Sequence, residues 1–133
     1  LICQYLDEEL GGHKFLPPAG KPYFSDMRLQ TIGDGISEAA VSRTFERARP
    51  EAERSAMWTG RWERAITRAL DLLEAESRQL DGEPTIGTIA VYCALGYLDF
   101  RHADMDWRKG RKKLADFFAK NSDRPAFKET APA

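Results

Sequence analysis

The sequence PTIGTIAVYCALGYLDFR, at residues 84–101, sets the architecture of this chain. It has no charged residue from Ile86 to Leu98, although 31% of the whole chain is charged. Its apolar residues cover every side of a helix instead of one stripe, which is typical of a buried helix. It is too short and too interrupted by Gly and Tyr to span a membrane, and about thirteen residues is too long for a typical buried strand. We predict a central helix from about Thr85 to Phe100, with other helices packed around it.

The start of this helix carries its own signals. Thr85 is a good N-cap, Pro84 precedes it, and Ile89 stands where the partner of a hydrophobic staple belongs. The prediction of a helix beginning at Thr85 therefore rests on local capping chemistry as well as on apolar character.

Composition indicates one compact unit. The chain has 133 residues, a net charge of -1 and a pI of about 6.2, so no global field recruits nucleic acid or a membrane surface. Its two cysteines, Cys3 and Cys93, make no disulfide framework, and no signal peptide is visible, so we expect a reduced, cytoplasmic protein. The chain starts at Leu1 inside what reads as the end of an element, which suggests a piece of a larger protein.

Before the central helix, the pattern predicts three helices and a connector. Apolar residues at helical spacing over 1–10 stop at two glycines, and the Pro/Gly-rich segment 13–22 cannot be helical and reads as an interdomain linker. A second helix is predicted from about Ser25 to Arg49, capped by Ser25 or Asp26. Its Gly33 and Gly35 suggest a surface that approaches closely, and its charged end is expected to be solvated (Arg43, Glu46, Arg47, Arg49).

A third helix is predicted over 51–77, with Trp58, Trp62 and aliphatic residues on one stripe. After the central helix, a turn over 102–106 leads to an amphipathic helix over 107–121, and the tail 122–133 is expected to lie extended. No strand pattern is found. The fold class is all-α, a helical bundle of about four to six helices around the buried central helix.

The residues that could carry chemistry have simpler explanations. His13 and His102 lie far apart without further ligands at metal-binding spacing, so no metal site is expected. Cys93 lies in the apolar helix and is expected to pack in the core instead of acting as a thiolate. The basic run 108–113 reads as a solvated face, because no aromatic residues interleave it, and no nucleic acid is expected. The residues alone leave the function open.

Several phrases of the sequence resemble the C-terminal domain of bacterial cytosolic glutathione transferases. QYLDE at residues 4–8 resembles the end of the last helix of their thioredoxin-like N-terminal domain, and LPP at 16–18 their interdomain linker. DGI at 34–36 resembles their first long C-domain helix. The most specific phrases are PTIGTIA at 84–90 and ALGYLDFR at 94–101, which resemble the family's buried central helix.

The resemblance implies a division into domains, and this chain departs from the family's pattern at one position. Residues 1–10 would end a thioredoxin-like domain, 11–24 would be the linker, and 25–133 the helical domain. The family has an Asp three residues after the N-cap, where this chain has Thr88. Because losing a cap contact costs about 1 kcal/mol, we expect the helix to form with Thr85 and Thr88 as its structural cap, at some loss of stability.

The resemblance also implies a function. The family's thioredoxin-like domain binds glutathione, the co-substrate, and activates its thiol. The C-terminal domain supplies the pocket for a hydrophobic electrophile and much of a homodimer interface. If the resemblance holds, this chain contains no catalytic residue and no cofactor of its own. We therefore expect it to be inactive alone. It is either a piece of a transferase or a member without the catalytic half.

Candidate substrate-binding residues follow from the family's first C-domain helix, and each has packing or solvation as its alternative. Asp34 stands where some classes place an acid that reaches the γ-glutamyl amine of glutathione across the dimer. The full set is Tyr23, Met27, Thr31, Asp34 and Gly35. For Trp58, Trp62, Trp107 and Asp99 we expect structural roles. The alternative function is a non-catalytic protein-interaction module of the same domain type.

Overall fold

The computed structural model describes residues 1–131, which contain helices and no strand, so the all-α prediction is confirmed. The α-helices are α1 (Ile2–Glu9), α2 (Lys21–Ala48), α3 (Ala56–Ala75), α4 (Ile86–Arg101), α5 (Lys112–Ser122) and α6 (Pro125–Glu129). Three short 3-10 helices join them: η1 (Glu51–Glu53), η2 (Ser77–Leu80) and η3 (Ala103–Met105).

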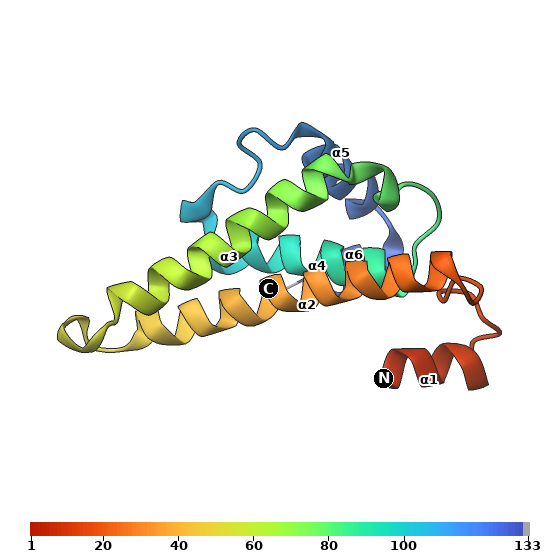
Figure 1. Ribbon diagram of the computed structural model, residues 1–133, viewed down its shortest axis with the longest axis horizontal. Helices are drawn as coiled ribbons and strands as arrows, with labels where there is room; N and C mark the ends of the chain where they lie inside the picture. Colours follow the sequence, from red (N-terminus) through yellow and green to blue (C-terminus); the bar gives the residue numbers. More distant parts are fainter. Residues whose placement is uncertain (132–133) are drawn as a thin grey trace.

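The long helices α2 and α3 form a hairpin that turns at η1, and α4 packs along α2 (Figure 1). Their apolar stripes meet in one core because residues three or four apart fall on the same face of a helix. The most deeply buried large apolar side chains come from all three helices and from α5: Ile36, Ile66, Leu70, Leu73, Val91, Leu95, Leu98 and Leu114. Figure 1 shows α1 apart from this bundle, near the N-terminal end of α2.

The central helix is not buried on every side, contrary to the sequence-based expectation. Val91, Ala94, Leu95 and Leu98 are fully buried, but Ile89 is only half-buried and Cys93 is exposed. The prediction that Cys93 packs in the core is therefore wrong. The remaining helices cover one side of α4, and its other apolar side stays open.

The second helix begins earlier than predicted. It starts at Lys21 with Gly20 as N-cap, so Lys21 and Pro22 are helical and neither Ser25 nor Asp26 caps it. Proline is tolerated there because the first helical turn has no N–H partner to lose. Gly20 has a φ of 106°, a conformation that glycine adopts without strain.

Other helix ends differ from the prediction for similar reasons. Helix α3 begins only after Ser55, whose side chain accepts the Trp58 N–H, and residues 51–53 form η1 instead. Positive φ angles at Asp106 and Gly110 delay the start of α5 to Lys112. The tail is not extended, since Pro125 opens α6. Residues 132–133 of that predicted tail lie outside the described part.

The glycines of α2 differ from each other. A β-carbon on Gly33 would lie 2.7 Å from the Ala90 carbonyl carbon of α4, whereas one on Gly35 would meet nothing within 4 Å. The predicted close approach is therefore confirmed at Gly33 and wrong at Gly35.

The charged end of α2 is not simply solvated. Arg43 and Glu46 are buried, and the Arg43 guanidinium pairs with Glu63 and Asp104 at 2.9 and 2.6 Å. Arg43 also donates to His102 Nδ1, while His102 Nε2 donates to the Ala40 carbonyl at 2.8 Å. These contacts satisfy a buried charge and tie η3 to α2 and α3.

Candidate functional site

The N-terminus of α4 is held by three separate segments. Ile86 N–H donates to the Phe15 carbonyl at 3.0 Å, Gly87 N–H to Asp26 Oδ2 at 3.0 Å, and Thr88 N–H to Thr85 Oγ1 at 3.2 Å. Thr88 Oγ1 accepts the Thr85 N–H at 2.8 Å, so Thr85 and Thr88 form the capping box. The first amides of a helix lack intrahelical partners, and here the connector, α2 and the cap supply them.

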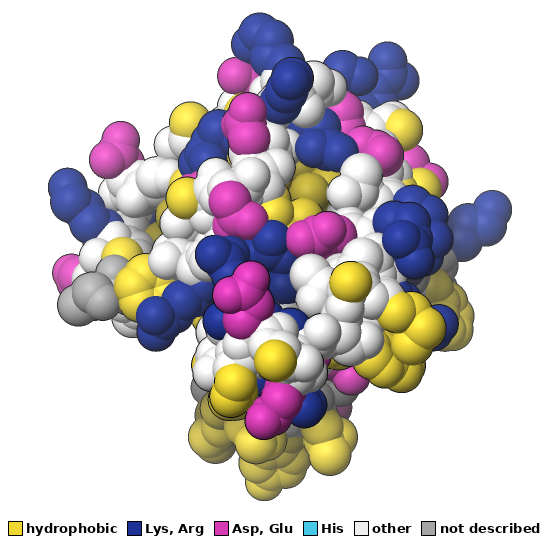
Figure 2. Space-filling model, turned by 90° about the vertical axis from the view of Figure 1, so that its left-hand side faces the viewer, with side chains coloured by type: hydrophobic (Ala, Val, Ile, Leu, Met, Phe, Trp, Pro, Cys, Tyr) yellow, Lys and Arg dark blue, Asp and Glu magenta, His cyan; other side chains and the backbone are white. Residues whose placement is uncertain are grey.

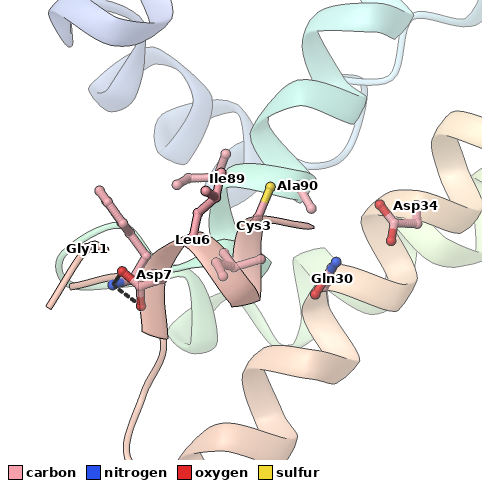
Figure 3. A pocket seen from close by; sticks show the side chains of 10 residues that line it. Cys3, Leu6, Asp7, Gly11, Gln30, Asp34, Ile89 and Ala90 are labelled. Carbon is pink, nitrogen blue, oxygen red and sulfur yellow. Dashed lines mark hydrogen bonds between the residues drawn. The ribbon is translucent and has the colours of Figure 1, made fainter. Parts of the chain in front are cut away.

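Beside this helix start, α1, α2 and α4 enclose an apolar groove of about 470 Å³. Figure 3 shows Cys3 and Leu6 of α1 on one side, Ile89 and Ala90 of α4 behind them, and Gln30 and Asp34 on successive turns of α2. The groove is therefore mostly apolar with two polar groups on one wall, as is common for small-molecule sites.

Asp7 closes the end of the groove and is buried. Its carboxylate accepts the backbone N–H groups of Lys14, Phe15 and Leu16. Burial favours the neutral acid, but the hydrogen bonds from Leu16, Phe15 and Lys14 outweigh it, and the pKa of Asp7 lies below its ordinary value. Asp7 is therefore a charged structural group with its oxygens already occupied.

Of the predicted substrate-binding residues, the structure brings only Asp34 to this groove. Tyr23 lies at a separate hollow formed with the connector. Met27 Sδ accepts the Gln4 amide at 2.8 Å, and Thr31 Oγ1 donates to the Met27 carbonyl. Gly35 is exposed on α2. Sequence reasoning missed Gln30, which the four-residue spacing to Asp34 on one helix face signals. It also missed Ile89 and Ala90, because α4 was expected to be covered.

A second groove of about 470 Å³ lies between α4 and the C-terminal helices. The Tyr92 ring is stacked between Phe118 and Phe127, with centroids 4.6 and 3.9 Å away. Cys93 borders this groove, and although the residue is exposed overall, partial desolvation of its thiol by the neighbouring side chains raises its pKa. A raised pKa keeps the thiol protonated at neutral pH, so Cys93 lacks the character of a nucleophile.

The tryptophans and Asp99 have structural contacts. Trp107 is buried and its indole N–H donates to Asp99 Oδ1 at 2.8 Å, while Asp99 also pairs with Arg108. Trp58 and Trp62 stack on each other, with Trp58 exposed. The pairing of Asp99 with Arg108 could not be read from the sequence, where Arg101 is the nearer cation.

Across residues 1–131, no three His, Cys, Asp or Glu side chains come together as metal ligands. Within the same described range, none of the helices is long and apolar enough to cross a lipid bilayer.

On one face of the molecule, acidic and basic side chains are interspersed and apolar side chains gather at one edge. Figure 2 shows Lys and Arg interspersed with Asp and Glu over one end of the molecule. Hydrophobic side chains collect at its lower edge, at the level of α1 in Figure 1. In and next to α1, the side chains of Leu1, Ile2, Tyr5 and Leu10 are all exposed, Leu1 by 90% and Ile2 by 75%. Contiguous exposed apolar patches are typical of protein–protein or membrane interaction sites and of ligand-binding grooves.

A family model described as "Glutathione S-transferase, C-terminal domain" matches residues 45–120. The GST-like protein YibF of Escherichia coli K12, itself uncharacterised, is 32% identical over 135 residues, covering 99% of this chain and 67% of YibF.

Solved structures agree with this match. A glutathione transferase family member from Pseudomonas fluorescens Pf-5 with bound S-(propanoic acid)-glutathione has a TM-score of 0.95 and 36% identity, covering 99% of this chain and 69% of that one. A glutathione S-transferase from Methylobacillus flagellatus KT with glutathione bound has a TM-score of 0.92 and 27% identity, covering 100% of this chain and 68% of that one. The chain thus spans about two thirds of the length of these relatives.

Proposed function

The chain belongs to the glutathione S-transferase family, and we propose that it is the C-terminal domain of a transferase that conjugates glutathione to hydrophobic electrophiles. In this proposal α1 is the end of a thioredoxin-like domain that binds glutathione and activates its thiol. Residues 1–10 end that domain, 11–24 link the two, and 25–133 form the helical domain.

The observation that carries the proposal is the apolar groove between α1, α2 and α4. One wall is the uncovered side of α4, at Ile89 and Ala90, and the opposite side is formed by α1. The exposed apolar residues of α1 continue this surface outward. A second domain seated there would bury both, and the greater length of the relatives supports its presence.

The polar wall of the groove supports a role in substrate binding. Asp34 is exposed on α2 and, like Gln30, borders the groove. A carboxylate at this place would pair with the γ-glutamyl amine of glutathione, while the apolar lining of the groove at Leu6, Ile89 and Ala90 would face the electrophile. The helical domain would bind and orient, and thiolate formation would occur in the other domain.

We further propose that the assembled protein is a cytoplasmic homodimer. Both cysteines are free in the structure, as expected of a protein kept in a reducing compartment. Light scattering on the assembled protein tests the dimer.

A chimera tests the function directly. The segment of the Pseudomonas fluorescens relative that precedes its matched region would be fused before Leu1. The chimera and the 133-residue chain are then compared by calorimetry with glutathione and by conjugation of chlorodinitrobenzene. We expect binding and turnover in the chimera, and neither in the chain alone.

Matched variants refine the result. Asp34→Asn in the chimera should raise the KM for glutathione, whereas Glu38→Gln, one turn further along α2 and also exposed, should leave it unchanged. Turnover by the chain alone would overturn the division of labour. A chimera that folds and binds glutathione without conjugating any electrophile would instead favour a non-catalytic interaction module.

A further inference from the structure

The Asp7 carboxylate joins α1 to the connector that follows it. Asp7 is 4% exposed, and its two oxygens accept the backbone N–H groups of Lys14, Phe15 and Leu16 at 2.9, 3.1 and 2.8 Å. Three consecutive amides converge on one side chain, so the connector is wrapped around the end of α1. A carboxylate that accepts several amides makes strong, directional contacts.

The backbone around Asp7 is shaped to this contact. The Asp7 carbonyl accepts the His13 N–H at 3.0 Å, and His13 has a φ of 58°. A β-carbon on Gly11 would lie 2.9 Å from both Asp7 Cα and Asp7 Oδ1. A left-handed residue and a glycine are thus needed for the chain to turn back over this side chain.

The same connector is bonded to the central helix. Phe15, whose N–H donates to Asp7, accepts the Ile86 N–H through its carbonyl at 3.0 Å. Asp7, the Phe15 peptide groups and the first amide of α4 therefore form one hydrogen-bonded chain from α1 to α4. Between α1 and α2 the structure gives a side-chain bond from Gln4 to Met27.

We infer that Asp7 is a positioning residue that latches α1, through the connector, to the N-terminus of α4. Its consequence rests on the proposed function: the latch fixes the orientation of the preceding domain over the groove. Helix α1 then moves with the helical bundle, and the segment 11–24 is an ordered connector that holds α1 in place.

The native cysteines allow a direct test. Cys3 lies on α1 and Cys93 on α4, both are exposed, and the chain has two cysteines in all. Nitroxide labels on both would report the distance from α1 to α4 by pulsed electron resonance. Asp7→Asn places an amide NH₂ opposite backbone N–H groups, and Glu8→Gln makes the same charge change at an exposed neighbouring residue.

The latch predicts one narrow distribution of the distance between the two labels in the unsubstituted chain and in Glu8→Gln, and a broad one in Asp7→Asn. The thermal unfolding midpoint of the bundle should be the same in all three. Amide exchange at Leu16 and Ile86 should accelerate about tenfold or more in Asp7→Asn. An unchanged distribution in a folded Asp7→Asn chain would overturn the inference.

A second pair of variants covers the case in which Asp7→Asn fails to fold. Gly11→Ala presses on Asp7 and should broaden the distribution, while Gly35→Ala, with open space around it, should not. These distances are measured without glutathione, so they test the latch even if the chimera proves inactive. In an active chimera, Asp7→Asn should lower kcat/KM about tenfold, and Glu8→Gln should leave it unchanged.

Discussion

The Asp26 carboxylate accepts the Gly87 N–H at 3.0 Å across 61 residues of sequence. Its other oxygen accepts the Thr85 hydroxyl, and the side chain is 4% exposed. Helix N-termini favour negative charge because their amide dipoles point outward. Asp26 of α2 thus supplies to α4 the carboxylate that the capping box itself lacks, since its third position is Thr88.

Replacing Thr88 by Asp should therefore fail to stabilise the chain. A second carboxylate would lie close to Asp26, and like charges disfavour each other. In an Asp26→Asn background the same change should raise the free energy of unfolding, because only one carboxylate then faces the amides. Asp26→Asn alone should lower that free energy by about 1–3 kcal/mol. Urea unfolding of the four proteins in this double-mutant cycle measures the coupling, and additive effects would contradict the proposed sharing of one helix end.

Replacing each of the two glycines of α2 by alanine should change the stability of the chain in opposite directions. Gly35→Ala should stabilise the chain by about 0.5–1 kcal/mol, because alanine loses less backbone entropy in a helix and nothing obstructs its β-carbon. Gly33→Ala should destabilise it by about 1–3 kcal/mol, because α2 and α4 must move apart. Thermal unfolding distinguishes the two, and equal shifts would mean that the helices adjust without cost.

Protonation of His102 should weaken the fold in mild acid. His102 is 1% exposed, and this burial lowers its pKa from the usual 6.5. The positive charges of Arg43 and Arg47 act in the same direction, whereas the Ala40 carbonyl and Asp104 act in the opposite direction. A lowered native pKa means that the unfolded chain binds the proton more readily, so stability is complete above about pH 6.5 and falls as the pH drops below it.

Chemical denaturation at about pH 7.5 and about pH 5.5 checks this expectation. The pKa of Asp104 is about 2, held down first by the hydrogen bond from Arg43, so Asp104 stays ionised across this window. His102→Gln should flatten the pH dependence, whereas His13→Gln, an exposed histidine, should not alter it. If the pH dependence of stability persisted in His102→Gln, it would have to arise from another titrating group.

Asp99 should tolerate Asn better than Ala. An Asn oxygen still accepts the Trp107 indole N–H, and the lost ion pair with the half-exposed Arg108 is worth about 1 kcal/mol or less. Alanine leaves the buried indole N–H unpartnered, at a cost of about 1–3 kcal/mol. Equilibrium unfolding followed by Trp fluorescence compares them, and equal losses would show that the indole bond contributes little.

Parts of the candidate site were accessible from sequence patterns and parts were not. Asp34 was predicted at a substrate site and does border the groove, but Gln30 and Ile89 were missed. An apolar run indicates that a helix avoids water, and it cannot say which neighbour covers each side. For the same reason Arg43 was expected in solvent, although two segments distant in sequence, α3 and the start of η3, supply its partners.

The sequence alone determined the presence of α4, its start at Thr85 and the all-helical class, because capping, apolar character and helical spacing act over a few residues. The tertiary structure decided which side of α4 remains open, that Asp26 completes its cap, and that Asp7 binds the connector. The last two outcomes depend on hydrogen bonds between carboxylates and backbone amides of separate segments. The packing of α1 and α2 against α4 brings these groups together, and no local sequence pattern encodes that packing.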